Sequence, residues 1–439
     1  MKAMEIFSFS ARFPVNSWIR KRKGVYPLRD AFMFGKKRRI LLRIRILISL
    51  YPEIMILTCW SECKKASCQN RMRTQQTFFL FLAIIFCPLA ICQELIPPVS
   101  KVGKGPLLQA RQIFSLSKRP TSSCHASTIV ETRGGLVAAW FGGTHEGHRD
   151  VGIWISRYGN GKWSVPVEVV NGVQSRTKRY PCWNPVLFQP ENGPLVLFYK
   201  VGPSPSSWWG MMTTSTDHGK TWSWPTKLGE NPLIGHLLGP VKNKPLELQD
   251  GLILCPSSSE KGDKWRVHFE MTRDLGKTWE VIGPINDGVE FDAIQPSLLT
   301  PKNGGLQILC RSRQNVVTQS WSSDGGKTWR PMVASSLPNP NAGTDALTLA
   351  DGRHLIVYNH TTRKSAVPGR RMLNVAISEE GMMWSPVVTL EKTSQAENSD
   401  RSVEYSYPAV IQTQDGKIHI TYTYHRKGVK HVILDPEHL

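Results

Sequence analysis

The segment Ser322-Ser323-Asp324-Gly325-Gly326-Lys327-Thr328-Trp329 decides the fold of this chain, because close copies of it recur along the sequence. Full copies run from Ser215 to Trp222 and from Thr272 to Trp279, and degenerate copies run from Ser156 to Trp163 and from Ser378 to Trp384. The copies lie about 50 to 60 residues apart, a period typical of repeat architectures. We therefore expect one closed repeat fold rather than two or three separate domains.

Each copy has the composition of a rigid β-turn. The Asp can accept hydrogen bonds from nearby backbone N–H groups, the Gly permits a positive φ, and the Trp supplies a large apolar anchor. Asp217, Asp274 and Asp324 are therefore interpreted as turn formers and not as catalytic or metal-binding residues.

Six β-hairpins separate these turns. Each consists of a polar residue, a short apolar strand, a turn and a second apolar strand, and the turns are Gly134-Gly135, Asn192-Gly193, Asp250-Gly251, Gly304-Gly305, Asp351-Gly352 and Asp415-Gly416. A third strand, the box turn and a closing strand follow each hairpin. Six four-stranded units with no helical period predict an all-β, six-bladed β-propeller, because radial closure protects strand edges. We expect residues 107–439 to form it, with Leu107 to Arg111 pairing with the last blade.

The polar residues that precede the six first strands are candidates for a binding site. In a propeller the first strand of each blade lines the central channel, so these residues should form a ring at one mouth. Six different side chains at equivalent positions favour a site over a structural repeat. They are His125, Asn184, Lys244, Gln295, Asp345 and Tyr407.

The chain carries 55 Lys and Arg against 34 Asp and Glu, but this imbalance lies mostly in the first 92 residues. Residues 93–439 contain 38 basic and 30 acidic residues, a net charge of +8. That modest charge, without an aromatic-basic motif, does not predict a nucleic-acid partner. We also expect no metal, no cofactor and a monomer.

Residues 72–92 resemble a secretory signal peptide. Met72-Arg73 begins a short basic region, Phe78 to Ile91 is apolar, and Ala90-Ile91-Cys92 provides small residues before a cleavage point near Gln93. A signal anchor is the alternative, but the apolar run is short of the ~20 residues that span a bilayer. We expect a secreted protein without a stable membrane span, residues 1–71 as a non-native or disordered extension, and 93–106 as a linker.

Four cysteines remain after residue 92: Cys124, Cys182, Cys255 and Cys310. In an oxidising compartment they allow two disulfides in three pairings, and four buried free thiols are the alternative. Asn359-His360-Thr361 is the single N-glycosylation sequon of this region.

Loops on the expected mouth add titratable groups. The segment Phe141 to Asp150 contains two histidines, Glu146 and Asp150, and a carboxylic acid with a raised pKa is the use we expect for one of these carboxyls. Arg311 ends the second strand of the fourth blade, and Arg370-Arg371 precedes the third strand of the fifth. Arginines delivered by two blades to one mouth predict a carboxylate, sulfate or phosphate ligand.

With these boxes, hairpins and polar groups, residues 107–435 resemble the sialidase (neuraminidase) superfamily, in particular its BNR-repeat branch. In that superfamily three arginines bind a carboxylate, a tyrosine is the nucleophile, a glutamate activates it, and an aspartate is the acid/base. By position, Tyr407 matches the nucleophile, Asp150 the acid/base, and Arg311 and Arg371 two of the arginines. His125 stands in place of the first arginine and Gln295 in place of the glutamate.

The resemblance implies a secreted glycoside hydrolase that acts on an acidic glycan, with Asp150 and Tyr407 as catalytic residues. Two alternatives stay open. One is a polysaccharide lyase for a uronate, with adjacent His125 and Tyr407 as base and acid. The other is a non-catalytic glycan-binding propeller. In each case Arg311, Arg371, Gln295, Asn184, Lys244 and Asp345 are the expected binding residues.

Overall fold

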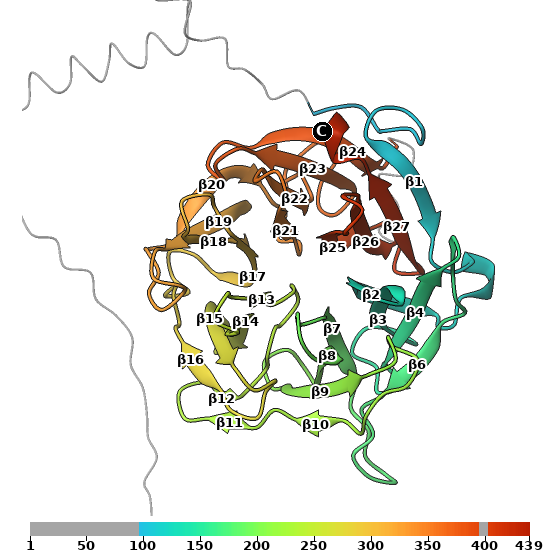
Figure 1. The fold of residues 1–439 in the computed structure, drawn as a ribbon, viewed down its shortest axis with the longest axis vertical. Coiled ribbons are helices and arrows are strands. Elements are labelled where there is room, and N and C mark those ends of the chain that lie inside the picture. Colours follow the sequence, from blue (N-terminus) through green and yellow to red (C-terminus); the bar gives the residue numbers. More distant parts are fainter. Residues whose placement is uncertain (1–95, 395–402) are drawn as a thin grey trace, which may run out of the picture. The chain divides into compact units, whose positions relative to one another are not determined.

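The computed structural model describes residues 96–394 and 403–439, which belong to one compact unit of the chain. Six antiparallel sheets are arranged around a central axis as the blades of a β-propeller, which confirms the predicted fold class (Figure 1). The expected extension 1–71 and signal peptide 72–92 lie outside the described residues. In the described part of the chain, no helix is long and apolar enough to cross a bilayer.

The strands of the first three blades follow the chain from the inside of the propeller outwards. Blade 1 contains β2 (Ser123–Thr132), β3 (Gly135–Gly143) and β4 (Gly152–Gly159), with β5 (Lys162–Trp163) and β6 (Val167–Val170) both pairing with β4. Blade 2 contains β7 (Cys182–Phe188), β8 (Leu195–Val201), β9 (Trp209–Ser215) and β10 (Thr226–Lys227). A small hairpin of β11 (Glu230–Asn231) and β12 (Gly235–His236) precedes blade 3, which contains β13 (Leu246–Glu247), β14 (Ile253–Lys261), β15 (Lys264–Thr272) and β16 (Glu280–Ile282).

The last three blades repeat this order. Blade 4 contains β17 (Ala293–Leu299), β18 (Leu306–Ser312), β19 (Val316–Ser322) and β20 (Val333–Pro338). Blade 5 contains β21 (Asp345–Thr348), β22 (His354–Tyr358), β23 (Met372–Ser378) and β24 (Ser385–Lys392). Blade 6 contains β25 (Tyr405–Gln412), β26 (Ile418–Tyr424) and β27 (Gly428–Leu434). Two single 3₁₀ turns, η2 (Leu116–Lys118) and η3 (Pro436–His438), complete the described elements.

The ring closes through β1 (Leu107–Gln112), which pairs antiparallel with β27 from Leu107 opposite Leu434 to Gln112 opposite Lys430. This pairing supplies blade 6 with its fourth strand and confirms the predicted closure. Residues 96–106, expected to be a linker, also contact the propeller. Ser100 N–H donates to the Thr389 carbonyl on β24 at 2.9 Å.

The core lies between neighbouring blades. Every residue of β7, β8, β17 and β18 is buried, because adjacent sheets cover both faces of these strands. One buried cluster joins Val137 and Ile153 of blade 1 to Leu187 and Leu197 of blade 2, and similar clusters follow around the ring. Burial on two faces explains the continuous apolar runs that the sequence shows there.

The box turns have the predicted geometry. Asp324 accepts hydrogen bonds from the Thr328 N–H at 2.9 Å and from the Thr328 hydroxyl at 2.6 Å, and Trp329 Nε1 donates to the Gly326 carbonyl at 2.9 Å. Asp217 and Asp274 make the equivalent contacts. These turns follow the third strands, so they lie at the strand ends opposite to the mouth where Tyr407 is found.

Two sequence features are settled by burial. The four cysteines of the described region are buried free thiols, so the structure contains free thiols at these positions and not the two disulfides. Asn359 is fully buried, and its Nδ2 donates to the carbonyls of Met372 and Tyr405 at 2.6 and 2.8 Å. The amide of this sequon is therefore not accessible for glycosylation in the folded protein.

Candidate functional site

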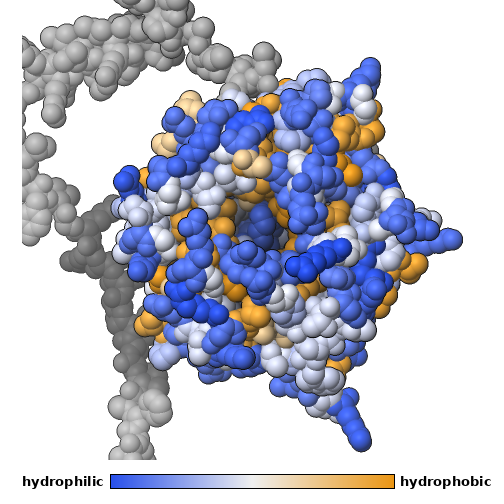
Figure 2. All heavy atoms as spheres, viewed as in Figure 1, coloured by the Kyte–Doolittle hydropathy of each residue, from blue (hydrophilic) through white to orange (hydrophobic). Residues whose placement is uncertain are grey.

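Bulges in the inner strands aim polar side chains at the channel. The register shifts after His125 in β2, after Trp183 in β7, after Ile294 in β17 and after Ser406 in β25. Asn184, Gln295 and Tyr407 have positive φ values of 35°, 59° and 51°. A bulge bends its strand and redirects a side chain. Figure 2 shows a hollow at the centre of the ring, with hydrophilic residues inside it.

Tyr407 is the centre of the cluster. Arg311 Nη1 donates to its hydroxyl at 2.7 Å, and Gln295 Nε2 lies 3.4 Å from the same oxygen. The His125 ring packs against the Tyr407 ring with centroids 4.1 Å apart, as expected for neighbours from blades 1 and 6. The structure thus brings together four sequence-predicted residues from blades 1, 4 and 6.

Arg311 is a buried cation without an ion pair among the described residues. Its side chain stacks over Trp265, with Cζ 4.9 Å from the ring centre, and Nε donates to Asn341 Oδ1 at 2.7 Å. No described carboxylate lies within salt-bridge distance of it. Burial lowers the pKa of the guanidinium from its usual value, but arginine remains charged at neutral pH. Burying such a charge is costly without a compensating partner. The charge of Glu260 favours the charged form of Arg311 without forming an ion pair with it, so a ligand anion could supply the direct pair.

Glu404 binds two further arginines, Arg370 before β23 and Arg426 after β26, and the first of them lies over the Tyr407 ring. Arg370 lies with Cζ 5.3 Å from the centre of the Tyr407 ring, and its Nη1 donates to Glu404 at 2.9 Å. Arg426 donates to the other Glu404 oxygen at 2.7 Å and also pairs with Glu146. Burial opposes ionisation of Glu404, but the charges of Arg370 and Arg426 hold its pKa well below the usual range.

Glu404, Arg426 and Glu260 were missed by the sequence analysis. Glu404 precedes β25 by one residue and Arg426 lies in the turn after β26, both outside the repeated motifs. Glu260 pairs in register with Trp265, the residue on which Arg311 stacks. Burial raises its pKa, and the charges of Arg311 and Arg313 only partly offset this effect. The sequence signal that could have found Glu260 is an acidic residue next to the turn of the β14–β15 hairpin.

The carboxyl of Asp150 does not have the raised pKa that the sequence analysis expected. It accepts hydrogen bonds from the Thr144 N–H at 3.0 Å and the Thr144 hydroxyl at 2.6 Å, and its side chain is 41% exposed. Although burial acts to raise it, the pKa of Asp150 is lowered to about 2 by the bonds from Thr144 and by His148. The prediction of a raised pKa was therefore wrong for Asp150, because its loop solvates the carboxylate.

His125 is a buried neutral base. Burial, and then the charge of Arg426, hold the pKa of its imidazole well below the usual value of 6.5. Its Nδ1 forms a hydrogen bond with the Thr423 hydroxyl at 2.9 Å. A neutral imidazole fixed against Tyr407 can accept a proton, whereas it cannot replace an arginine as a carboxylate ligand.

The other ring positions support the channel wall. Lys244 Nζ lies 3.0 Å from both oxygens of Asp345, and Asp345 also accepts from the Val410 N–H at 2.8 Å. These two residues therefore bind each other and link blades 3, 5 and 6. Asn184 is buried in β7. Arg371 is half-buried, and its carbonyl accepts from the Thr393 N–H at 2.9 Å. The adjacent Arg370 lies over the Tyr407 ring.

Lys242 lies next to Tyr407, with Nζ 5.9 Å from the centre of its ring. Its fully buried Nζ donates to the Thr344 carbonyl at 2.7 Å, to the Pro408 carbonyl, and to Asn243 Oδ1 at 2.8 Å. These contacts join blade 3 to blades 5 and 6. Burial lowers the pKa of Lys242 to about 7, and Asp345 partly offsets this.

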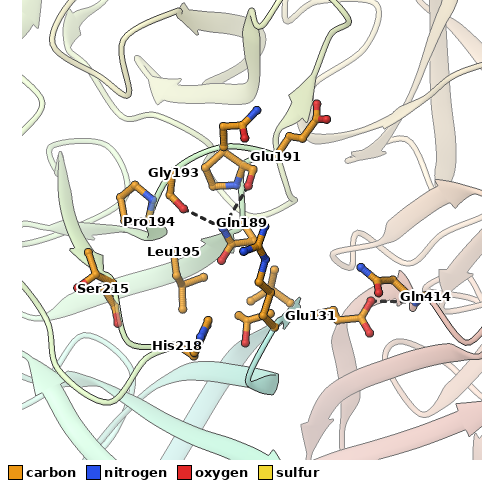
Figure 3. A pocket seen from close by; sticks show the side chains of 15 residues that line it. Glu131, Gln189, Glu191, Gly193, Pro194, Leu195, Ser215, His218 and Gln414 are labelled. Atoms are coloured by element: carbon orange, nitrogen blue, oxygen red, sulfur yellow. Dashed lines mark hydrogen bonds between the residues drawn. The ribbon is translucent and has the colours of Figure 1, made fainter.

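A separate cavity of about 680 Å³ lies at the opposite strand ends, between blades 1, 2 and 6. Figure 3 shows Glu131, Gln189, His218 and Gln414 around it. Its walls are hairpin turns and a box turn, so it does not belong to the Tyr407 cluster.

The family of BNR repeat-like domains matches residues 134–420. The chain belongs to this family. No sequence among curated proteins matches the chain significantly. Its fold is similar to that of the Hadza microbial sialidase Hz136 (15% identity, TM-score 0.63, 75% of this chain and 69% of that one). It is also similar to the NanB sialidase from Streptococcus pneumoniae (12%, 0.58, 78% and 72%) and to the intramolecular trans-sialidase from Ruminococcus gnavus (14%, 0.57, 75% and 98%).

A protein of unknown function from Dyadobacter fermentans is matched over its whole length, with 16% identity and a TM-score of 0.61. These likenesses confirm the sialidase-like propeller. At such low identities the fold is shared, and activity has to be argued from the residues.

Proposed function

We propose that this sialidase-like propeller is a carbohydrate-active protein that binds the carboxylate of an acidic sugar at the Tyr407 mouth and hydrolyses its glycosidic bond. The buried Arg311, which has no described ion partner, is the observation that carries the proposal. Arg370 lies over the Tyr407 ring as Arg311 does, and Glu404 pairs with both Arg370 and Arg426. A charge-assisted pair with a ligand carboxylate offsets the burial of Arg311.

For hydrolysis, the Tyr407 hydroxyl passes its proton to a water molecule as its oxygen forms a bond to the anomeric carbon, and the bond from that carbon to the glycosidic oxygen breaks. Arg311 Nη1, 2.7 Å away, stabilises negative charge that develops on the phenol oxygen. Glu260, whose pKa is raised by burial, is the described carboxyl suited to give the leaving oxygen a proton. Asp150 is ionised at neutral pH and so suits the second step as the base. In that step Asp150 accepts a proton from a water molecule, whose oxygen attacks the anomeric carbon and displaces the Tyr407 oxygen.

Elimination on a uronate is the second candidate, and the contact between His125 and Tyr407 favours it. Neutral His125 would take the proton next to the sugar carboxylate, an arginine would stabilise the resulting charge, and Tyr407 would protonate the leaving oxygen. Gln295 in place of a glutamate also suits this reaction, since no carboxylate then activates Tyr407.

The test is a screen of acidic glycans, read for released monosaccharide and for the ultraviolet absorbance of an unsaturated uronate. Released sugar supports hydrolysis, absorbance supports elimination, and binding without either supports a glycan-binding propeller. Tyr407→Phe should keep most affinity and lose turnover. His125→Ala should abolish elimination but mainly weaken binding in a hydrolase.

Arg311→Ala should weaken binding of the acidic glycan by about one to two orders of magnitude, because one charge-assisted contact is worth roughly 1.5–3 kcal/mol. Arg311→Lys should restore only part of it, since lysine lacks the bidentate fork. Arg273→Ala is the control, because Arg273 is an exposed arginine on a box turn. Unchanged affinity in Arg311→Ala would refute the anionic-sugar site.

We also propose that the protein is secreted after cleavage near Gln93. The apolar run and small residues before that position support this. Amino-terminal sequencing of protein from the culture medium should begin near Gln93, and retention of residues 1–71 would contradict the proposal.

A further inference from the structure

Two of the bulges at the mouth leave main-chain groups outside the strand ladder. In β25 the pairing register skips Tyr407 and Pro408. In β17 it skips Gln295 and Pro296. The backbone at Tyr407 and Gln295 also has a positive φ, which in a non-glycine residue persists only where the surrounding structure holds it. Buried carbonyl groups in such segments need hydrogen-bond donors from outside the ladder.

Two neighbouring buried residues before β13, Lys242 and Asn243, supply these donors. Lys242 Nζ donates to the Pro408 carbonyl in β25. Asn243 Nδ2 donates to the Gln295 carbonyl at 3.0 Å and to the Pro296 carbonyl at 3.1 Å. Lys242 Nζ also donates to Asn243 Oδ1 at 2.8 Å, which links the two side chains. Side chains of blade 3 therefore hold the bulges of blades 4 and 6.

The segment that carries these two side chains is itself fixed. Glu270, a fully buried carboxylate of β15, accepts from the Leu238 N–H at 3.0 Å and from the Gly239 N–H at 2.7 Å. The Val241 N–H donates to the Pro256 carbonyl of β14 at 3.0 Å. The donors that follow this segment therefore start from a main chain anchored to blade 3.

The bulges that they hold carry the groups closest to the proposed chemistry. The Tyr407 hydroxyl lies 2.7 Å from Arg311 Nη1 and 3.4 Å from Gln295 Nε2. The opposite side of the Tyr407 ring is closely packed, since a Cβ added at Gly343 would lie 3.2 Å from Tyr407 Cδ2 and 3.3 Å from Lys242 Cε. A displacement of about 1 Å at a reacting group can lower a rate about a hundredfold. Loss of support at either bulge therefore changes distances on which turnover depends.

We propose that Lys242 and Asn243 are positioning residues that hold Tyr407 and Gln295 in place for the reaction at the mouth. The inference deepens the proposed function, and its kinetic consequence rests on that function. In this role neither side chain contacts the ligand. Each acts through a main-chain carbonyl at or beside the residue that it positions.

The first test observes the Tyr407 ring without any ligand. In protein labelled with fluorotyrosine, the Tyr407 signal in the fluorine NMR spectrum is the one that Tyr407→Phe removes. Lys242→Met keeps the length of the side chain and removes its donors, so it should shift or broaden this signal. Asn243→Ala should do the same and serves if Lys242→Met does not fold. An unchanged Tyr407 signal in the folded variants overturns the proposal.

Lys200→Met is the matched control, because Lys200 is the other buried lysine among the described residues. Its Nζ donates to the Pro240 carbonyl and to neither bulge, and the bonds made by Glu270 and Val241 keep that segment in place without it. This variant should lower the midpoint of thermal unfolding and leave the Tyr407 signal where it is in the parent.

The second test measures turnover per mole of folded protein on the acidic glycan that the parent accepts, beginning with 3′-sialyllactose and a hyaluronan tetrasaccharide. Lys242→Met and Asn243→Ala should lower kcat at least about tenfold and change KM less than about threefold, because Arg311 remains to bind the carboxylate. Lys200→Met should leave kcat within about twofold of the parent.

The outcomes separate this inference from the proposed function. Equal losses of kcat in Lys242→Met and Lys200→Met would show that both lysines act through stability alone, and they would overturn the positioning role. A parent that turns over no acidic glycan of the screen overturns the proposed function, whereas the comparison of Tyr407 signals still decides whether Lys242 and Asn243 position that ring.

Discussion

At the residue scale, the Tyr407 hydroxyl is held by an amide where a hydrolase of this kind would use a carboxylate. Gln295 Nε2 lies 3.4 Å from that oxygen and Gln295 Oε1 lies 3.4 Å from Arg311 Nη1. The side chain is buried and has the same length as glutamate. Replacing Gln295 by glutamate would therefore place a carboxylate beside the Tyr407 hydroxyl through a single substitution.

Gln295→Glu should raise the rate of hydrolysis of an acidic glycoside at least tenfold, because a positioned general base typically contributes about 10²–10⁴. Arg311 would pair with the new carboxylate and reduce the cost of burying it. Initial rates of sugar release would measure the effect. Gln412→Glu, in β25 and bonded to the Ala350 N–H, is the control. A variant that folds and gains no hydrolysis would speak against Tyr407 as the nucleophile.

His125 gives a prediction for stability against pH. Its pKa lies well below 6.5 in the folded protein, whereas the unfolded chain has the usual value. The unfolded state therefore takes up the proton first, and the free energy of unfolding should fall as the pH drops below about 6.5. One such histidine contributes at most roughly 1.4 kcal/mol per pH unit.

His125→Gln should reduce this acid sensitivity between about pH 6.5 and 5, since glutamine does not titrate. Urea unfolding at several pH values would measure the slope. His438→Gln provides a matched control, because His438 is exposed in the terminal turn. An unchanged slope in His125→Gln would mean that His125 is protonated in the folded protein.

At the scale of elements, the hairpins and box turns could be predicted because their signals are local. An Asp-Gly or Gly-Gly pair between apolar runs specifies a hairpin, and Asp324 contacts residues only a few positions away. Closure by β1 followed from the same reasoning about exposed edges, and the register with β27 confirms it.

The finer arrangement of the inner strands could not be predicted in the same way. Bulges at Tyr407 and Gln295 depend on packing across the channel, as do the contacts of Lys242 with carbonyls of blades 5 and 6. The choice between Arg370 and Arg371 depends on the path of the segment before β23. Glu404 and Arg426 are separated by 22 positions and meet only through tertiary structure.

At the scale of the whole molecule, ring closure places residues from distant parts of the chain at one mouth. His125 lies in the first blade and Tyr407 in the last, yet their rings are in contact because blade 6 is next to blade 1. The site therefore exists only if the ring is closed, and closure depends on β1.

A chain that starts at Ile113 should lose this closure, whereas one that starts at Gln93 should keep it. Removing β1 exposes the edge of β27 and the core that Leu107 covers, since Leu107 is 4% exposed within the cluster of blades 5 and 6. An unpaired edge of this kind also promotes aggregation. The midpoint of thermal unfolding should fall by several degrees or more, and glycan affinity should fall with it.

A peptide of residues 104–114 provides the control for this truncation. Added in excess, it should restore the midpoint of the shorter chain, because a segment that binds only the folded state stabilises it by an amount that grows with the logarithm of its concentration. The same peptide with Leu107→Asp should not restore it, since a charge would enter the apolar cluster. If the chain starting at Ile113 unfolds at the same temperature as the one starting at Gln93, β1 does not close the propeller, and the neighbouring positions of His125 and Tyr407 must be maintained by packing between blades 1 and 6 alone.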